Sequence, residues 1–272
     1  MSRSKIGSTL SKKRKITFLR KLSVLSICVL FLISIFILFL TNDKIRIKEN
    51  IVINGNTSIS TEDILKIVND ELNKRYLFFI PTDNFFLLRR DSIKESIYSD
   101  FKKIKEIKIN IDNFTYLILE IEERKTESLW CDNLPDKYEK CYFMDEEGFI
   151  FAKAPDLTLN DFKKFFGLIE DDVIGKQYFS KEEFFENKKM ITEIEKIGFL
   201  PKYFVALSNK DFEVIFSGGA KICFDRTDSV DNNINKIKVL IQEGLIKIDK
   251  DFIDTLNHID LRYGDKIHYD FK

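Results

Sequence analysis

The first feature of the hydrophobic pattern is one unbroken apolar run near the start of the chain. Residues Leu22 to Leu40 read LSVLSICVLFLISIFILFL, with no charge, glycine or proline. A helix with a rise of about 1.5 Å per residue makes this run roughly 30 Å long, which matches the apolar core of a bilayer. The pattern therefore predicts a single transmembrane helix over residues 22–40.

A cleaved signal peptide is the alternative explanation for this run. Its apolar core normally spans about 7–15 residues and ends at a cleavage site with small residues. The run here is longer, and TNDKIRIKEN follows it without such a site. We therefore expect an uncleaved anchor.

A strand and two helices are predicted next. Isoleucines at positions 45, 47, 51 and 53 alternate with other residues, as one buried strand face requires. Asn54-Gly55-Asn56 breaks this strand, and Ser60 has the chemistry of a helix N-cap with acidic residues in the following turn. Apolar residues four positions apart predict a second helix over residues 84–101.

Two strands joined by a tight turn complete this first module. Alternating isoleucine and leucine residues predict strands around 107–111 and 117–121, with Asn113-Phe114 at the turn. The predicted order over residues 45–124 is strand, helix, helix, strand, strand. A three-stranded sheet with both helices on one face would bury the apolar stripe of each element.

Residues 125–272 predict a second domain in which strands dominate. A capping box, Ser180-Lys181-Glu182-Glu183, starts one helix, and Gly198 ends it. A second helix is predicted over residues 229–243. The predicted strands lie at residues 129–131, 141–144, 149–151, 203–208, 212–217 and 220–225, followed by two closing strands. We expect a mixed antiparallel sheet with two or more helices, which makes the whole chain α+β.

The closing strands occupy the sequence HIDLRYGDKIHYDFK. Ile259, Leu261 and Tyr263 are predicted to share one face, while Asp260 and Arg262 share the other. Gly264-Asp265 predicts the turn between the strands. The final strand carries an apolar stripe at Ile267, Tyr269 and Phe271.

Charge is distributed unevenly along the chain. The chain has 44 basic and 44 acidic residues, but residues 1–21 hold eight basic residues and no acidic one, so the rest carries 36 − 44 = −8. A basic flank before an apolar helix predicts a cytoplasmic N-terminus, with everything from about Thr41 outside. The acidic folded part argues against a nucleic-acid partner, because such proteins concentrate positive charge on their folded part.

The sequence contains no motif that brings a nucleophile, a base and an orienting group together. It has two histidines, and His258 is predicted to share a solvated strand face with Asp260. Nucleophile-elbow, phosphate-loop and zinc-protease patterns do not occur. We therefore predict a protein that is not an enzyme, with no catalytic residue, metal, cofactor or small-molecule substrate.

Two cysteines, Cys131 and Cys141, flank a polar stretch that contains Pro135. In an oxidising compartment they are candidates for a disulfide across the base of a loop. A metal pair is the alternative, but it needs two further ligands that the sequence does not supply at zinc spacing. Cys28 is predicted to face lipid or other helices, and Cys223 is predicted to be a buried small residue.

Adjacent phenylalanines occur at 78–79, 85–86 and 184–185. Such pairs could mark partner surfaces. In a chain with 26 phenylalanines we expect them to belong to the core.

Four stretches, in this order, resemble one protein family: IVINGNTSISTEDI, LEIEERKTESLW, CYFMDEEGFIF and HIDLRYGDKIHY. With the basic tail and the apolar helix, they make the chain similar to the bacterial cell-division family FtsQ, called DivIB in Gram-positive species. The first two resemble the start and the exit of the family's POTRA module. The others resemble an Asp-x-x-Gly hairpin and the closing strand. The chain lacks the prolines that the family often has between the POTRA hairpin strands and after the Glu-Arg pair, and its cysteine pair is not a general family feature.

The resemblance implies a scaffold at the division septum. It would sit in the inner or plasma membrane as a single-pass type II protein, with a basic cytoplasmic tail over residues 1–21. Its partners would be FtsB-like and FtsL-like bitopic proteins and other membrane proteins of the divisome, and through them septal peptidoglycan synthesis. A POTRA-type component of envelope protein assembly or transport is one alternative, and a membrane-anchored envelope hydrolase is another.

In this family the closing strand of the second domain receives a strand of FtsB. An edge strand offers unpaired backbone groups for such β-strand addition, and Tyr263 would be its aromatic anchor. Arg262 would pair with an acidic residue of the partner or with Asp260 of its own chain, and a strand covered by its own chain is the alternative for the whole site. The partner-binding residues implied are Arg262, Tyr263, Lys266, Ile267, His268, Tyr269 and Phe271.

Overall fold

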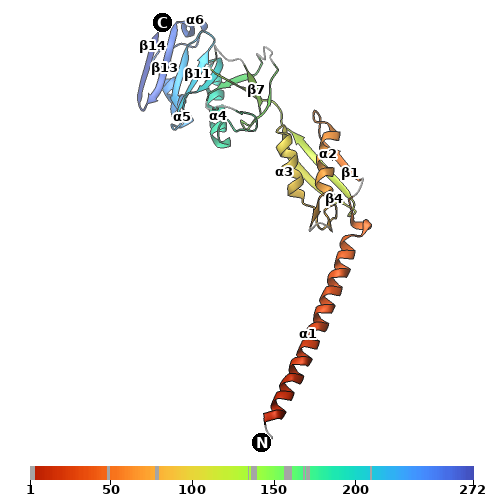
Figure 1. The fold of residues 1–272 in the computed structure, drawn as a ribbon. Helices are drawn as coiled ribbons and strands as arrows, with labels where there is room; N and C mark the ends of the chain where they lie inside the picture. Colours follow the sequence, from red (N-terminus) through yellow and green to blue (C-terminus); the bar gives the residue numbers. More distant parts are fainter. Residues whose placement is uncertain are drawn as a thin grey trace. The chain divides into compact units, whose positions relative to one another are not determined.

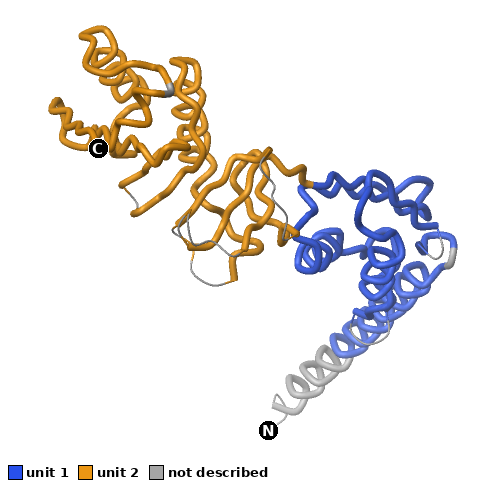
Figure 2. Tube along the Cα trace, turned by 90° about the horizontal axis from the view of Figure 1, so that it is seen from above, with its two compact units in different colours: residues 1–123 blue, residues 124–272 orange. Residues whose placement is uncertain are grey.

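The computed structural model divides the chain into two compact units, residues 1–123 and 124–272 (Figure 2). It describes residues 4–47, 50–76, 80–133, 135, 140–155, 161–167, 169, 172–208 and 210–272. Each unit is presented by itself below.

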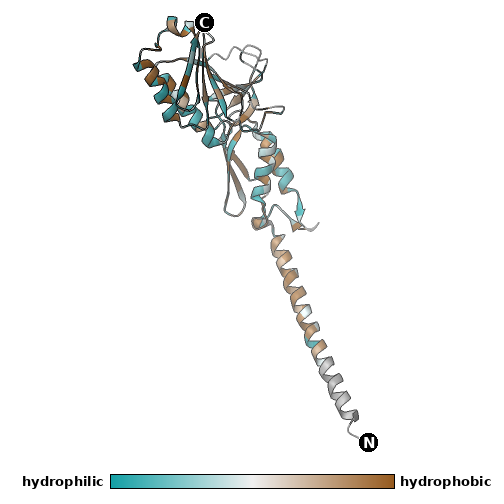
Figure 3. Cartoon of the chain, turned by 90° about the vertical axis from the view of Figure 1, so that its left-hand side faces the viewer, coloured by the Kyte–Doolittle hydropathy of each residue, from teal (hydrophilic) through white to brown (hydrophobic). Residues whose placement is uncertain are grey.

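A long helix, α1 (Ser4–Leu40), opens the first unit (Figure 1). Its residues Thr17–Leu40 are mostly apolar, and the most apolar 18 of them are not buried against the rest of the chain. Figure 3 shows this part of α1 in the brown of apolar residues. By length and composition the helix can cross a membrane, although a signal sequence would meet the same criterion. The helix begins well before the predicted span of 22–40.

The rest of the first unit is a three-stranded sheet with two helices. The sheet has the order β1-β5-β4, in which β1 runs parallel to β5 and β4 runs antiparallel to it. The bounds are β1 Ile51–Asn54, α2 Thr61–Leu72, α3 Arg90–Asp100, β4 Ile104–Asp112 and β5 Tyr116–Glu123. Buried residues of both helices share one core with alternate residues of β4 and β5. This common core places both helices against one face of the sheet.

Local signals predicted several of these features correctly. Ser60 caps α2, because its side chain accepts a hydrogen bond from the backbone N–H of Glu62. Asn113 and Phe114 both have positive φ angles, 49° and 62°, as the tight turn between β4 and β5 requires. Leu117, which follows this turn in β5, is fully buried.

Two other predictions for the first unit are wrong. The strand expected from Ile45 begins only at Ile51, because Asp43–Ile45 form a 3-10 helix. Ile47 is buried, but the other three isoleucines are half-buried. The helix expected over 84–101 begins only at Arg90, because the chain before it is held in a turn. A small hairpin, β2 (Arg75–Tyr76) with β3 (Ile80–Pro81), was not predicted.

The second unit is built on a nine-stranded mixed sheet with the order β14-β13-β12-β11-β10-β9-β6-β7-β8. Neighbouring strands in this sheet run antiparallel, except for the parallel pairs β12–β13, β10–β9 and β9–β6. The α+β class and the mixed sheet expected from the sequence are therefore confirmed. The bounds are β6 Ser128–Cys131, β7 Cys141–Met144, β8 Ile150–Lys153, β9 Lys163–Phe166, β10 Pro201–Ala206, β11 Asp211–Phe216, β12 Lys221–Asp225, β13 Leu256–Tyr263 and β14 Lys266–Phe271.

Helices α4 (Lys181–Ile197) and α5 (Val230–Gln242) share the large core of this sheet, and a short helix, α6 (Lys250–Thr255), precedes β13 (Figure 1). The predicted capping box at the start of α4 is confirmed, with reciprocal hydrogen bonds between Ser180 and Glu183. Gly198 ends α4 at a φ angle of 113°. Strand β9 and helix α6 were not predicted.

The phenylalanine pairs are not uniformly core. Phe184 is buried, but Phe185 is 67% exposed. Phe86 is exposed while Phe85 is half-buried. Adjacent residues on a helix or turn point in different directions, so one member of a pair can leave the core. The pair at 78–79 lies outside the described residues.

Candidate partner-binding edge

Strand β14 is the outermost strand of the nine-stranded sheet (Figure 1). It pairs antiparallel with β13, from Leu256 opposite Phe271 to Tyr263 opposite Lys266. No strand among the described residues lies on the other side of β14. Six residues at about 3.3 Å each give an open edge of roughly 20 Å, along which backbone N–H and C=O groups face away from the sheet.

The alternation of apolar and polar residues explains why this hairpin forms. Ile259 and Leu261 of β13 are fully buried in the large core. On β14, Ile267 and Tyr269 are half-buried against the same core. Gly264 adopts a φ angle of 62° in the turn between the strands. The open edge is therefore fastened to the unit by its apolar face.

A β-bulge in β13 changes the direction of Tyr263. The four residues from Asp260 to Tyr263 lie opposite only three residues of β14, from His268 to Lys266. This extra residue moves Tyr263 to the face of Asp260 and His268, where its ring lies 5.1 Å from the His268 ring. The prediction that Tyr263 shares a face with Ile259 and Leu261 is wrong for this reason. The Tyr263 side chain is 58% exposed.

Arg262 pairs within its own chain. Its guanidinium donates from Nε to Asp260 Oδ1 at 2.9 Å and from Nη2 to Asp260 Oδ2 at 2.6 Å. Its Nη1 donates to Asp211 Oδ1 at 3.3 Å, and its backbone N–H donates to Asp260 Oδ1 at 3.1 Å. The sequence left open whether Arg262 pairs with Asp260 or with an acidic residue of a partner, and in the structure it pairs with Asp260. These bonds also brace the bulge.

Asp260 itself is not solvated as predicted, because it is only 5% exposed. The hydrogen bond from Arg262 lowers the pKa of this carboxylate and outweighs the opposing effect of burial. The same bond raises the pKa of Arg262. The pair therefore stays ionised, and the two side chains hold the edge in place.

The next strands inward continue this polar face. Lys221 of β12 donates to Glu213 of β11 at 2.7 Å, and Cys223 donates to the same oxygen at 3.4 Å. Burial, with the neighbouring Glu213 carboxylate, raises the pKa of the Cys223 thiol to about 12. Cys223 is buried, as expected, and its protonated thiol has no nucleophilic character at neutral pH.

The far end of β14 is held by side chains as well. His258 Nδ1 lies 2.6 Å from Asp270, and the Phe271 ring packs edge-on against Phe252 of α6 at 5.4 Å. Lys272 donates from Nζ to the carbonyl oxygens of Gly218 and Asp254. The whole length of the edge is thus kept in position.

The expected partner-binding residues divide into three groups. Tyr263, Lys266, His268 and Phe271 are exposed. Ile267 and Tyr269 are half-buried and pack on the core, so they help to position the edge. Arg262 is occupied within the chain. Sequence reasoning missed Asp270, His258 and Asn257, which meet across β13 and β14, because only the strand register brings them together.

The cysteine pair lies away from this edge. Cys131 of β6 and Cys141 of β7 are opposite each other and are joined by a disulfide. Within the part of the chain that the structure describes, no group of three or more His, Cys, Asp or Glu side chains could hold a metal ion.

The fold and this edge define a class of protein. It is an α+β chain with an N-terminal helix long and apolar enough to cross a membrane, and with a mixed sheet that ends in an open strand. No known protein-family model matches the chain, and no curated protein matches it.

Proposed function

We propose that this chain is a non-enzymatic, membrane-anchored scaffold that resembles FtsQ/DivIB and binds an FtsB-like segment by β-strand addition to β14. The observation that carries the proposal is the position of β14 at the rim of the nine-stranded sheet, with one side unpaired among the described residues. The partner strand would extend the sheet from nine strands to ten.

The chemistry of the edge supports this mode of binding. Backbone hydrogen bonds along β14 would supply affinity, and the exposed side chains beside it would supply specificity. Tyr263 is a large, exposed aromatic residue next to His268, and such residues often dominate binding energy. Lys266 and Asp270 add one charge of each sign at opposite ends of the strand, which would favour a partner segment in one register.

The proposed topology places α1 in the inner or plasma membrane, with the basic residues of the tail in the cytoplasm. The residues from about Thr41 onward would then lie outside, where an oxidising environment would keep the Cys131–Cys141 disulfide formed. Residues 45–124, nearly all of which belong to the first unit, would act as a POTRA module that assists recruitment. FtsB-like and FtsL-like bitopic proteins would connect the chain to septal peptidoglycan synthesis at midcell.

A second candidate is a POTRA-type component of envelope protein assembly or transport. The observation that favours it is the first unit, in which two helices cover a sheet of order β1-β5-β4 with β1 parallel to β5. A fluorescent fusion of the full chain separates the two functions. Signal concentrated at midcell in dividing cells supports the division scaffold, whereas uniform envelope signal supports the assembly function.

The binding mode is tested by Tyr263→Glu in the full-length protein, co-expressed with the FtsB-like protein of the same genome and captured in detergent. A charge at this anchor should reduce capture of the partner by about 30-fold, the equivalent of a hot spot of about 2 kcal/mol. Phe185→Glu is the matched control, because Phe185 is equally aromatic and even more exposed, on α4. The control should bind like the wild type.

Folding of the Tyr263→Glu protein is checked by its melting temperature, since an exposed side chain contributes little to stability. If Tyr263→Glu melts like the wild type and still captures the partner in full, β14 is not the docking strand and the proposal is wrong.

A further inference from the structure

An unbroken series of aromatic rings lies at the end of α1 in the first unit. The Phe39 ring, in the last turn of the helix, lies 6.0 Å from the Phe86 ring. Phe86 contacts Phe85 at 5.0 Å, and Phe85 contacts Phe114 in the β4–β5 turn at 4.9 Å. Phe39, Phe86 and Phe114 are 49%, 57% and 55% exposed. We call these three exposed residues the aromatic collar.

The loop that carries Phe86 is fastened to the end of α1. Asn84 is fully buried, and its side-chain amide donates to the carbonyl oxygen of Leu40, one of the last carbonyls of the helix. The Asn84 side-chain oxygen accepts from the backbone N–H of Phe86 at 2.8 Å. Both polar atoms of this amide are therefore used to join the helix end to the collar.

Backbone hydrogen bonds strengthen the same junction. The Ile47 N–H donates to the Asp83 carbonyl at 2.7 Å, and the Phe85 N–H donates to the Ile45 carbonyl at 3.0 Å. The Arg46 guanidinium pairs with both carboxylate oxygens of Asp83, at 2.7 to 3.1 Å. This pair neutralises the one acidic residue of the loop, so the collar carries no net negative charge there.

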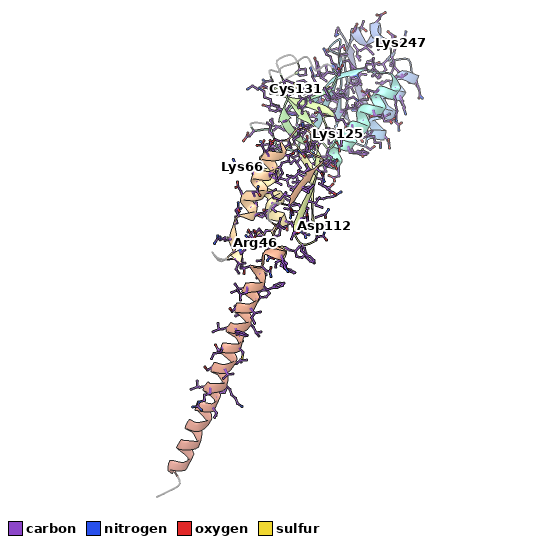
Figure 4. All side chains as sticks on the ribbon, turned by 90° about the vertical axis from the view of Figure 1, so that its right-hand side faces the viewer. Arg46, Lys66, Asp112, Lys125, Cys131 and Lys247 are labelled. Carbon is purple, nitrogen blue, oxygen red and sulfur yellow. A yellow bond between two sulfur atoms is a disulfide. The ribbon has the colours of Figure 1, made fainter. Side chains whose placement is uncertain are left out.

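The length of α1 puts the collar at a defined depth. The charge-free run Leu22–Leu40 is roughly 30 Å long as a helix, which matches the apolar core of a bilayer. The Leu40 end would therefore lie next to the layer of lipid headgroups. Figure 4 shows Arg46, which follows Phe39 in the chain, and Asp112, which precedes Phe114, at the α1 end of the unit.

We propose that the aromatic collar inserts into the interfacial layer of the membrane that α1 crosses, so that the first unit is attached at two points, the helix and the collar. The proposal rests on the membrane anchor of the proposed function and adds a lipid-binding surface to it. Phenylalanine is among the residues with which membrane-surface segments bury an apolar face at the boundary between headgroups and acyl chains. The bilayer is the occupant because the collar continues the exposed apolar surface of α1 itself, through the contact between Phe39 and Phe86.

Tryptophan fluorescence in vesicles tests this surface. The chain has one tryptophan, Trp130, which is buried in the second unit and gives a constant background. Full-length Phe86→Trp and Phe114→Trp proteins are reconstituted in phosphatidylcholine–phosphatidylglycerol vesicles, with and without bromine on the upper acyl carbons. Each should lose fluorescence in the brominated vesicles. Phe185→Trp, exposed on α4, is the matched control and should lose none.

A third variant, Phe36→Trp, reports on the membrane helix itself, because Phe36 is exposed on α1. Quenching of Phe36→Trp without quenching of Phe86→Trp and Phe114→Trp overturns the collar and leaves the anchor intact. If Phe36→Trp is not quenched, α1 does not cross the bilayer, and both the anchor and the collar are overturned. Shielding of Phe86→Trp from aqueous iodide without quenching by bromolipid means that protein covers the collar, which also overturns the proposal.

Discussion

At the scale of single residues, two neighbours mark the boundary between the units. The carboxylate of Glu123 accepts hydrogen bonds from the backbone N–H groups of residues 57–59 and from the Ser58 hydroxyl, all within the first unit. Arg124 pairs with the buried Asp145 and lies over the Phe149 ring at 4.0 Å, within the second. Each unit therefore holds its own boundary residue in place.

Glu123 predicts a specific pH dependence. Burial alone would raise the pKa of Glu123, but the four hydrogen bonds from residues 57–59 outweigh it and lower the pKa from 4.5 to about 2. A carboxylate with a lowered pKa stabilises the fold above the unfolded value, and this stabilisation is lost as pH falls from about 4.5 through 2. The wild type should lose roughly 3 kcal/mol in this window that Glu123→Gln does not lose.

The measurement is the free energy of unfolding of the full chain in detergent micelles between pH 7 and pH 2. Glu122→Gln is the control, since the Glu122 side chain is 59% exposed, and it should keep the acid sensitivity of the wild type. Equal pH curves for wild type and Glu123→Gln would contradict the role of Glu123.

At the scale of elements, a disulfide and a bulge determine the geometry of two hairpins. The β6–β7 hairpin is closed by Cys131 and Cys141, which lie opposite each other at the base of its loop. The β13–β14 hairpin has its bulge between Asp260 and Tyr263, and this bulge brings Tyr263 to the exposed side of the edge. A covalent bond restricts one loop, while an ion pair braces the other hairpin.

Reduction of the disulfide should destabilise the second unit. A crosslink that closes a loop with a sequence separation of ten residues contributes about 2–3 kcal/mol by restricting the unfolded chain. We expect dithiothreitol to lower the melting temperature of the wild type. The Cys131→Ser, Cys141→Ser double variant should melt at the lower temperature with or without dithiothreitol. A wild type that melts identically in both conditions would show that the disulfide contributes nothing to stability.

At the scale of the whole molecule, charge and hydropathy are segregated along the chain. Eight basic residues precede the apolar part of α1, and the remainder has a net charge of −8. For the proposed membrane anchor, the positive-inside rule would place the tail in the cytoplasm and the residues from about Thr41 onward outside.

This orientation predicts a labelling pattern in intact cells. A membrane-impermeant maleimide should label Lys266→Cys on β14, which is exposed, without cell lysis. The same reagent should label Ser11→Cys only after lysis, because residue 11 lies in the basic tail. Both variants retain Cys223, whose thiol is buried. Labelling of Ser11→Cys in intact cells would show that the orientation is the opposite of the expected one. A mature chain that lacks residue 11 would show that the helix is a cleaved signal.

The sequence alone determined features that depend on neighbouring residues. The apolar run predicted α1, Ser180 and Glu183 predicted the start of α4, and Asn113-Phe114 predicted a turn that needs positive φ angles. Period-two alternation also predicted most of the strands. Each of these signals lies within a few residues of the element it predicts, because capping, turn geometry and burial of one face act over that distance.

Tertiary structure alone decided the features that depend on distant pairing. Strand β9 lies between β10 and β6, and its pattern KKFF carries no alternation, so only its neighbours reveal it. The turn before α3 forms because Asn84 bonds to Leu40, 44 residues earlier, which overrides the local helical pattern. The direction of Tyr263 depends on an extra residue in the register with β14. Such pairings join positions far apart in the chain, so local sequence determines most of the strands, and only packing of the whole unit determines their order and which strand is left at the rim.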